Sequence, residues 1–100
     1  MVNRRSYSAS MLESLKDPKE AEAYLNASLD ENDPELFLVA LRNVAEAQGG
    51  VSKVAKKAKL NRESLYRMLS KDGNPQLDSL TQLLSVLGFR LAVGLKTHSS

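Results

Sequence analysis

The chain has 100 residues, of which 42% are apolar and 26% charged, a composition typical of a single globular domain. It contains no cysteine, which excludes disulfides and thiolate metal sites, and its only histidine, His98, stands in a polar tail that makes a poor metal site. No apolar run reaches the ~18 residues that a membrane span needs, and the first residues lack the apolar stretch of a signal peptide. We therefore expect a soluble, cytoplasmic protein without a cofactor.

The net charge of +2 hides an uneven distribution of charge along the chain. Residues 17–35 contain seven acids and one lysine, whereas residues 51–71 contain seven bases and one acid. The two segments therefore have opposite signs, which predicts a different partner for each.

Residues 1–16 are expected to form a mobile arm followed by a short helical turn, because their few apolar residues stand together near the end of this stretch. Asp17 and Pro18 then begin a helix that runs to about Ser28, since aspartate is a good N-cap and proline suits the first helical position. Residues 17–96 are expected to form the folded domain, and residues 97–100 a tail.

A second helix is predicted from Asp33 and Pro34 to about Ala47, and the glycines that follow supply the positive φ that ends a helix. Its apolar residues recur at helical spacing at Phe37, Leu41 and Val44. This face is expected to be buried.

Three further helices are predicted over residues 51–58, 62–70 and 77–87. The last one shows an apolar stripe at helical spacing, formed by Leu77, Leu80, Leu84 and Leu87. The chain is therefore expected to be mainly α-helical, with five helices.

Residues 89–95 change to a period of two, which is typical of a β-strand. The apolar positions of this pattern are Phe89, Leu91, Val93 and Leu95. A lone strand leaves backbone donors and acceptors unpaired, so we expect it to pair with the same strand of a second copy across a dimer axis. Pairing with the sheet of a different protein is the alternative.

The predicted helices over residues 51–58 and 62–70 are separated by only about three residues, Lys59 to Asn61, which indicates a helix-turn-helix over about residues 51–70. Apolar residues stand where two crossing helices would touch, at Val54, Ala55, Ala58, Leu60, Leu65, Met68 and Leu69. Lys59 holds the turn position where glycine is common because the backbone tends toward positive φ. We expect it to adopt that conformation at a cost of roughly 1 kcal/mol.

With Leu65 facing inward, the outer face of the second helix carries Glu63 and Arg67, flanked by Ser64 and Tyr66. Such side chains are able to hydrogen-bond base edges in the major groove of B-DNA. Asn61 is expected to cap this helix and Arg62 to lie near phosphates or base edges. Phosphate contacts are predicted for Lys53, Lys56, Lys57 and Lys71.

A simpler interpretation is that this lysine-rich face is only solvated and that Glu63 and Arg67 form an ordinary surface pair. The concentration of positive charge on one predicted bihelical unit favours the DNA-binding interpretation.

Three stretches resemble a known family: LKDPKEAEAYLNASL, DPELFLVALRNVAEAQGG and VSKVAKKAKLNRESLYRMLSKDGNPQLDSLTQLLSVLGFRLAV. They are similar to the addiction-module antidotes, HigA-like antitoxins that carry a lambda-repressor-like helix-turn-helix. The resemblance covers about residues 12–95, and its most specific parts are NRESLYRMLS, KDGNP and LGFRL.

This resemblance implies a five-helix lambda-repressor-like domain and a dimeric antitoxin of a type II toxin–antitoxin module. Such a protein binds a small basic toxin of the RelE/ParE-like class and represses its own operon. The resemblance also implies DNA contacts at Asn61, Arg62, Glu63, Ser64, Tyr66 and Arg67.

Three other classes of function stand beside this one. A purely structural helical adaptor would bind DNA weakly and without sequence preference. A stand-alone lambda-repressor-like transcriptional regulator without a toxin partner would share the DNA-binding pattern. An enzyme is not expected, because the chain lacks cysteine, a usable histidine and a glycine-rich phosphate loop.

Overall fold

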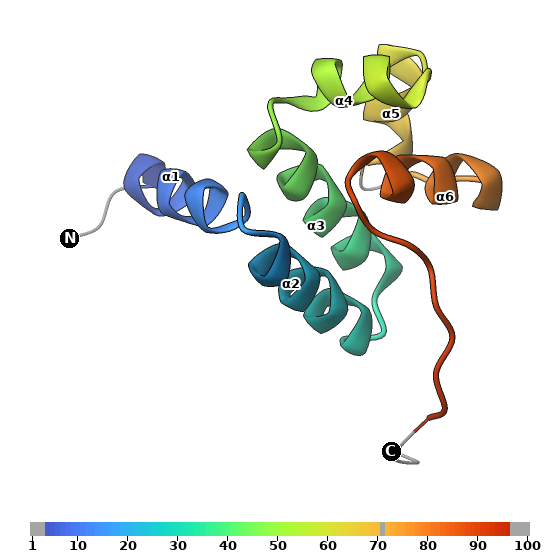
Figure 1. Ribbon diagram of the computed structural model, residues 1–100, viewed down its shortest axis with the longest axis horizontal. Helices are drawn as coiled ribbons and strands as arrows, with labels where there is room; N and C mark the ends of the chain where they lie inside the picture. Colours follow the sequence, from blue (N-terminus) through green and yellow to red (C-terminus); the bar gives the residue numbers. More distant parts are fainter. Residues whose placement is uncertain (1–3, 71, 97–100) are drawn as a thin grey trace.

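The computed structural model describes residues 4–70 and 72–96, and this part of the chain contains six helices and no strand (Figure 1). The helices are α1 (Arg4–Ser14), α2 (Pro18–Asp30), α3 (Pro34–Ala47), α4 (Val51–Ala58), α5 (Arg62–Met68) and α6 (Leu77–Val86). The prediction of a mainly helical fold is confirmed, and the five predicted helices correspond to α2 through α6. None of the helices described has the length and apolar character that crossing a membrane requires.

The additional helix is α1, which replaces much of the predicted arm. The C-terminal end of α1 packs against α3, and there Met11 and Leu12 are half-buried and the following Leu15 is buried. Its sequence gave no periodic signal because these apolar residues are confined to one end. The helix is therefore held by contacts that are distant in the sequence.

Helices α2 and α3 begin at the two predicted caps. The Asp17 carboxylate accepts a hydrogen bond from the backbone N–H of Lys19 at 2.9 Å, and Asp33 accepts one from Glu35 at 3.0 Å. Each cap is followed by proline at the first helical position, where no backbone donor is needed. A short turn between them lets α2 and α3 lie side by side (Figure 1).

The hydrophobic core lies between α3 and the helices around it. The predicted inner face of α3 is confirmed, since Phe37, Leu41 and Val44 are all buried. The stripe predicted on α6 is partly wrong, because Leu77 is 69% exposed at the first position of the helix while Leu83 is fully buried. Each buried leucine or valine contributes about 1.5–3 kcal/mol to folding.

Two side-chain amides connect helices across this core. The Gln48 amide, just after α3, donates to the carbonyl of Leu87 at 3.0 Å. The Gln82 amide on α6 donates to the carbonyl of Ala58, the last residue of α4. These bonds satisfy carbonyls at helix ends and fix α6 against α3 and α4.

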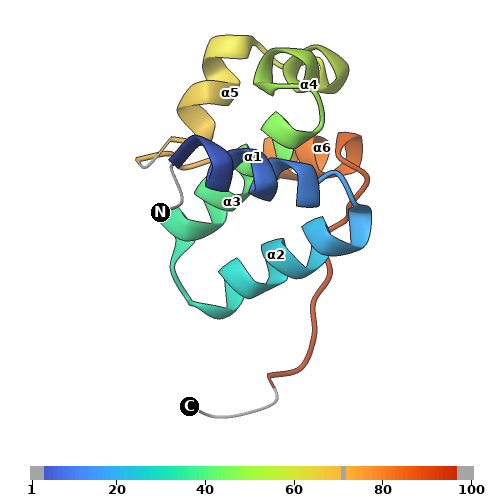
Figure 2. The ribbon, with the colours of Figure 1, turned by 90° about the vertical axis from the view of Figure 1, so that its left-hand side faces the viewer.

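Residues 89–95 do not form the predicted strand. Gly88, with φ of 94°, ends α6 and lets the N–H of Phe89 donate to the carbonyl of Leu84 at 2.8 Å. The chain then runs past α2 toward the C-terminus (Figure 2), with Leu91, Val93 and Leu95 exposed. A strand needs a neighbour to supply ladder hydrogen bonds, and the described part of this single chain offers none.

Candidate nucleic-acid interface

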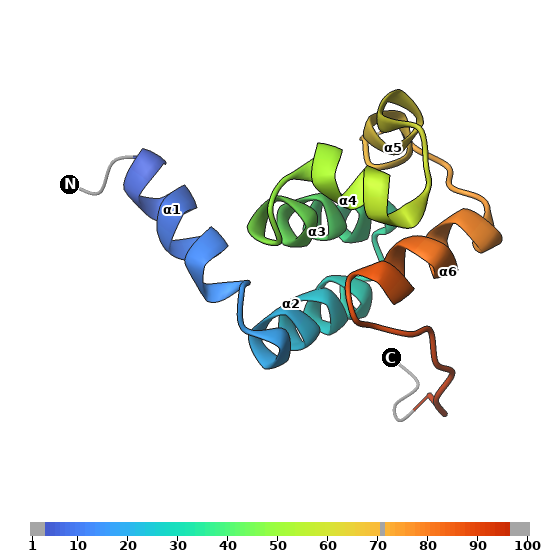
Figure 3. The ribbon, with the colours of Figure 1, turned by 45° about the horizontal axis from the view of Figure 1, so that its top comes forward.

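The short helices α4 and α5 pack together at one end of the molecule (Figures 1 and 3). Val54, Ala55 and Ala58 are buried on α4, and Leu65 and Leu69 are buried in and just after α5. Leu60 and Met68 are half-buried against the same core. The predicted apolar contact between the two helices is confirmed.

The turn between α4 and α5 has the predicted left-handed residue. Lys59 lies at φ 57° and ψ 38°, and across it the N–H of Leu60 donates to the carbonyl of Ala55 at 2.9 Å. This pattern closes the C-terminal end of α4. The chain changes direction at Lys59, so α5 begins only a few residues after α4 ends.

Asn61 caps α5, as predicted. Its side-chain oxygen accepts hydrogen bonds from the backbone N–H groups of Glu63 at 2.8 Å and Ser64 at 3.2 Å. The side-chain oxygen thus serves the helix, and the amide NH₂ is the part of Asn61 that remains for another partner.

Most of the predicted DNA-contacting residues are exposed on the neighbouring helices α4 and α5. Seven side chains besides Asn61 are exposed: Lys53, Lys56 and Lys57 on α4, and Arg62, Glu63, Ser64 and Arg67 on α5. Lys71 lies outside the described residues. Glu63 and Arg67 are one helical turn apart, yet they form no ion pair in the part of the chain described. Their polar groups are therefore available to a ligand.

Tyr66 differs from the other predicted contact residues because it is half-buried. The guanidinium carbon of Arg62 lies 5.8 Å from the centroid of its ring, and that of Arg42 lies 5.6 Å from the same point. Both distances are in the range of cation–π interactions. The Tyr66 ring thus interacts both with Arg62 of the exposed surface and with Arg42 of α3.

Arg42 was not among the residues predicted from the sequence. It is exposed and is the only lysine or arginine of α3, but it stands far from α5 in the sequence. The signal that could have pointed to Arg42 was a charged residue on the outer face of an otherwise apolar helix. That Arg42 lies next to Tyr66 could not be predicted without the fold.

The chemistry of this surface is that of hydrogen bonding and charge. A shallow depression on it is lined by Asn61, Arg62, Glu63 and Tyr66. These side chains offer donors, acceptors and positive charge, which suit phosphates and base edges. Within residues 4–70 and 72–96, no cluster of acidic or histidine side chains is arranged to hold a metal ion.

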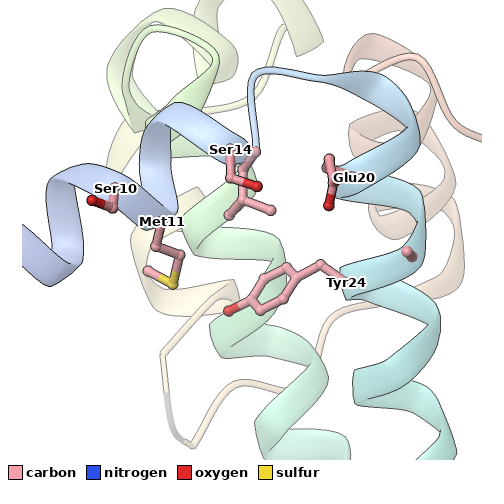
Figure 4. Close-up of a pocket in the computed structure, with 7 residues that line it drawn as sticks. Ser10, Met11, Ser14, Glu20 and Tyr24 are labelled. Carbon is pink, nitrogen blue, oxygen red and sulfur yellow. The ribbon is translucent and has the colours of Figure 1, made fainter.

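Two other hollows lie away from α4 and α5. Met11 of α1 and Tyr24 of α2 project into the first (Figure 4), and the Tyr24 hydroxyl accepts a hydrogen bond from the Asn43 amide at 2.8 Å. The second is a groove along α2 that also involves α3, α6 and the C-terminal segment. Its lining combines the opposite charges of Glu22 and Arg90 with the apolar side chains of Leu25, Leu29, Phe37, Leu84, Phe89 and Leu91.

Comparison with known proteins gives two matches. A family model described as "Probable addiction module antidote protein" matches residues 6–95. A protein of Haemophilus influenzae, described as uncharacterized, is 36% identical over 81 residues, which cover 81% of this chain and 82% of that protein. No solved structure matches the chain.

Proposed function

The chain belongs to the family of probable addiction module antidote proteins, and from this premise we propose that it is the antitoxin of a type II toxin–antitoxin module. It binds a RelE/ParE-like toxin and represses its own operon by binding operator DNA through α4 and α5. It acts by binding and not by catalysis. The observation that carries the DNA-binding half is the exposed cationic surface on two helices joined by a tight left-handed turn.

The geometry supports a helix-turn-helix in which α5 enters the major groove. An α-helix fits the width of that groove, and Arg67 and Glu63 on the exposed face of α5 match guanine and cytosine edges respectively. Lys53, Lys56 and Lys57 on α4 bind backbone phosphates, which sets the register without reading sequence.

The toxin-binding half of the proposal rests on the acidic segment from Asp17 to Glu35. The groove along α2 combines exposed apolar surface at Leu29, which is 51% exposed, with the carboxylate of Glu22. A basic protein with an apolar patch complements this combination. The turn between α2 and α3 lies away from α4 in Figure 1, so DNA and toxin use different surfaces.

A homodimer completes the proposal. The apolar side chains of Val93 and Leu95 are almost fully exposed in the single chain, and an extended pair of C-terminal segments would cover them. A two-fold dimer also places two copies of α5 on two half-sites of an operator.

Co-expression with the neighbouring open reading frame tests the toxin partner. We expect a small basic protein to co-purify with the chain through affinity and size-exclusion steps. If the purified neighbour does not bind and its expression is harmless without this chain, the toxin partner is wrong. A stand-alone transcriptional regulator is then the function that remains.

Two substitutions test the DNA interface. Arg67→Ala should weaken operator binding by about 1–3 kcal/mol, because a base contact is lost. Lys56→Ala should weaken binding to operator and unrelated duplexes alike and make the salt dependence shallower by about one unit, because a phosphate contact is lost. Binding isotherms at several salt concentrations measure both. Unchanged operator affinity of Arg67→Ala would remove Arg67 from the interface.

A further inference from the structure

The side chain of Arg42 lies beside the proposed DNA surface although α3 is not part of the helix-turn-helix. It is exposed, and its guanidinium carbon lies 5.6 Å from the centroid of the Tyr66 ring on α5. Glu46, one turn further along α3, forms no ion pair with it among the residues described. The positive charge of Arg42 is therefore directed to α5 and is not neutralised by a described carboxylate.

The ring of Tyr66 is positioned to hold the Arg42 guanidinium in place. Its ring is half-buried and faces two guanidiniums, since Arg62 lies 5.8 Å from the same centroid. A planar guanidinium stacks on an aromatic ring without using its hydrogen-bond donors, so those donors stay available. A side chain held in this way loses less rotamer freedom when it binds a ligand.

We propose that Arg42 is a phosphate-binding residue of the DNA interface and that Tyr66 is the positioning residue that orders Arg42 and Arg62 before DNA binds. This inference rests on the proposed DNA binding. Arg42 comes from α3 and not from the helix that enters the groove, so its contact is to the backbone and is independent of sequence. Tyr66 acts through the two arginines and does not read a base.

The test of Arg42 is Arg42→Gln, which removes the charge from an exposed position while keeping a polar side chain. The probes are a duplex from the promoter region upstream of the protein's own gene and a scrambled duplex of equal length. We expect affinity for both to fall by about tenfold at ~0.1 M salt, and the salt slope to decrease by about 0.9. Lys19→Gln is the matched control, since it removes one exposed charge from α2 and should leave the slope unchanged.

The test of Tyr66 compares Tyr66→Phe with Tyr66→Leu. Phenylalanine keeps the aromatic ring and should preserve affinity for both duplexes, whereas leucine should weaken both. The loss caused by Arg42→Gln should be smaller in the Tyr66→Leu background than in the wild-type chain, because the arginine is no longer ordered there. In the free protein, NMR should show ring-current shifts of the Arg42 side-chain protons that Tyr66→Phe retains and Tyr66→Leu abolishes.

Each outcome decides a different part of the inference. An unchanged salt slope in Arg42→Gln would overturn the phosphate contact, and a loss confined to the promoter duplex would make Arg42 a base reader instead. A loss of affinity in Tyr66→Phe would show a role for the hydroxyl and overturn the positioning role. If the wild-type chain binds neither duplex, the proposed DNA binding fails as well, whereas the NMR shifts still report the arrangement around Tyr66.

Discussion

The backbone of Lys59 determines how closely α5 follows α4. A left-handed residue at this point lets the chain reverse and brings Leu60 into contact with the core, at a steric cost of roughly 1 kcal/mol for any residue with a Cβ. Glycine would avoid that cost. A lysine is therefore tolerated at this position, although the left-handed backbone conformation does not favour it.

Replacing Lys59 by glycine should raise the free energy of unfolding by up to ~1 kcal/mol, because glycine adopts positive φ without strain. Lys57→Gly removes the same charge two residues earlier, inside α4, and should lower the free energy of unfolding by up to ~1 kcal/mol. Urea unfolding of both variants measures the difference. Equal effects at the two positions would contradict a left-handed conformation at Lys59.

Local chemistry at single residues was largely predictable. The caps at Asp17, Asp33 and Asn61 follow from side-chain preferences that operate within three residues, and all three were predicted correctly. The contact between Arg42 and Tyr66 could not be predicted, because it joins two helices whose relative placement only the fold determines.

Helix α5 has seven residues, too few to be stable by itself. Its stability depends on its cap and on the burial of Leu65. It also depends on Gly73, because a residue without a Cβ lets the turn after α5 approach the Met68 carbonyl closely. Because α4 and α5 have only eight and seven residues, the shape of the proposed interface depends on packing against the rest of the domain.

The cap can be separated from DNA contact by two substitutions of Asn61. Asn61→Ala should lower the free energy of unfolding by about 1 kcal/mol, because two backbone N–H groups lose their acceptor, whereas Asn61→Ser should cost little. Asn26→Ala, at an exposed position of α2, is the control and should change stability by less than ~0.5 kcal/mol. Thermal and urea unfolding give these values.

If Asn61→Ser folds like the wild-type chain but binds the operator more weakly, Asn61 also contacts DNA. If Asn61→Ala proves as stable as Asn61→Ser, the cap does not hold α5.

Among the elements, α2, α3 and α5 were predictable because a side-chain cap and the apolar spacing agree, whereas α4 and α6, which have no side-chain cap, were predictable from their apolar spacing. The prediction at residues 89–95 was wrong for a single chain, since alternation in sequence shows that a segment is able to pair but not that a partner is present. Helix α1 was missed for the opposite reason, because contacts with α3 stabilise it and its own pattern is weak.

At the scale of the whole molecule, the exposed apolar residues after α6 predict association. Val93→Asp should raise the dimer dissociation constant by at least about tenfold, because it places like charges in a buried apolar contact. The monomer should stay folded, since Val93 is 101% exposed in the single chain. Sedimentation equilibrium measures the dissociation constant.

Leu77→Asp is the control, because Leu77 is 69% exposed at the start of α6 and is not part of the proposed contact. Dimerisation unaffected by Val93→Asp would move the contact to another surface, and a wild-type chain that remains monomeric would end the homodimer proposal.

Helix α3 also acts as a spacer between charges of opposite sign. Four acids, Asp30, Glu31, Asp33 and Glu35, lie around its N-terminal end, while the lysines of α4 follow its C-terminal end. Its 14 residues separate the two groups by about 21 Å along the axis. Because the screening length at physiological ionic strength is only ~8 Å, these acids would be largely screened from the phosphates of a duplex bound to α4 as proposed.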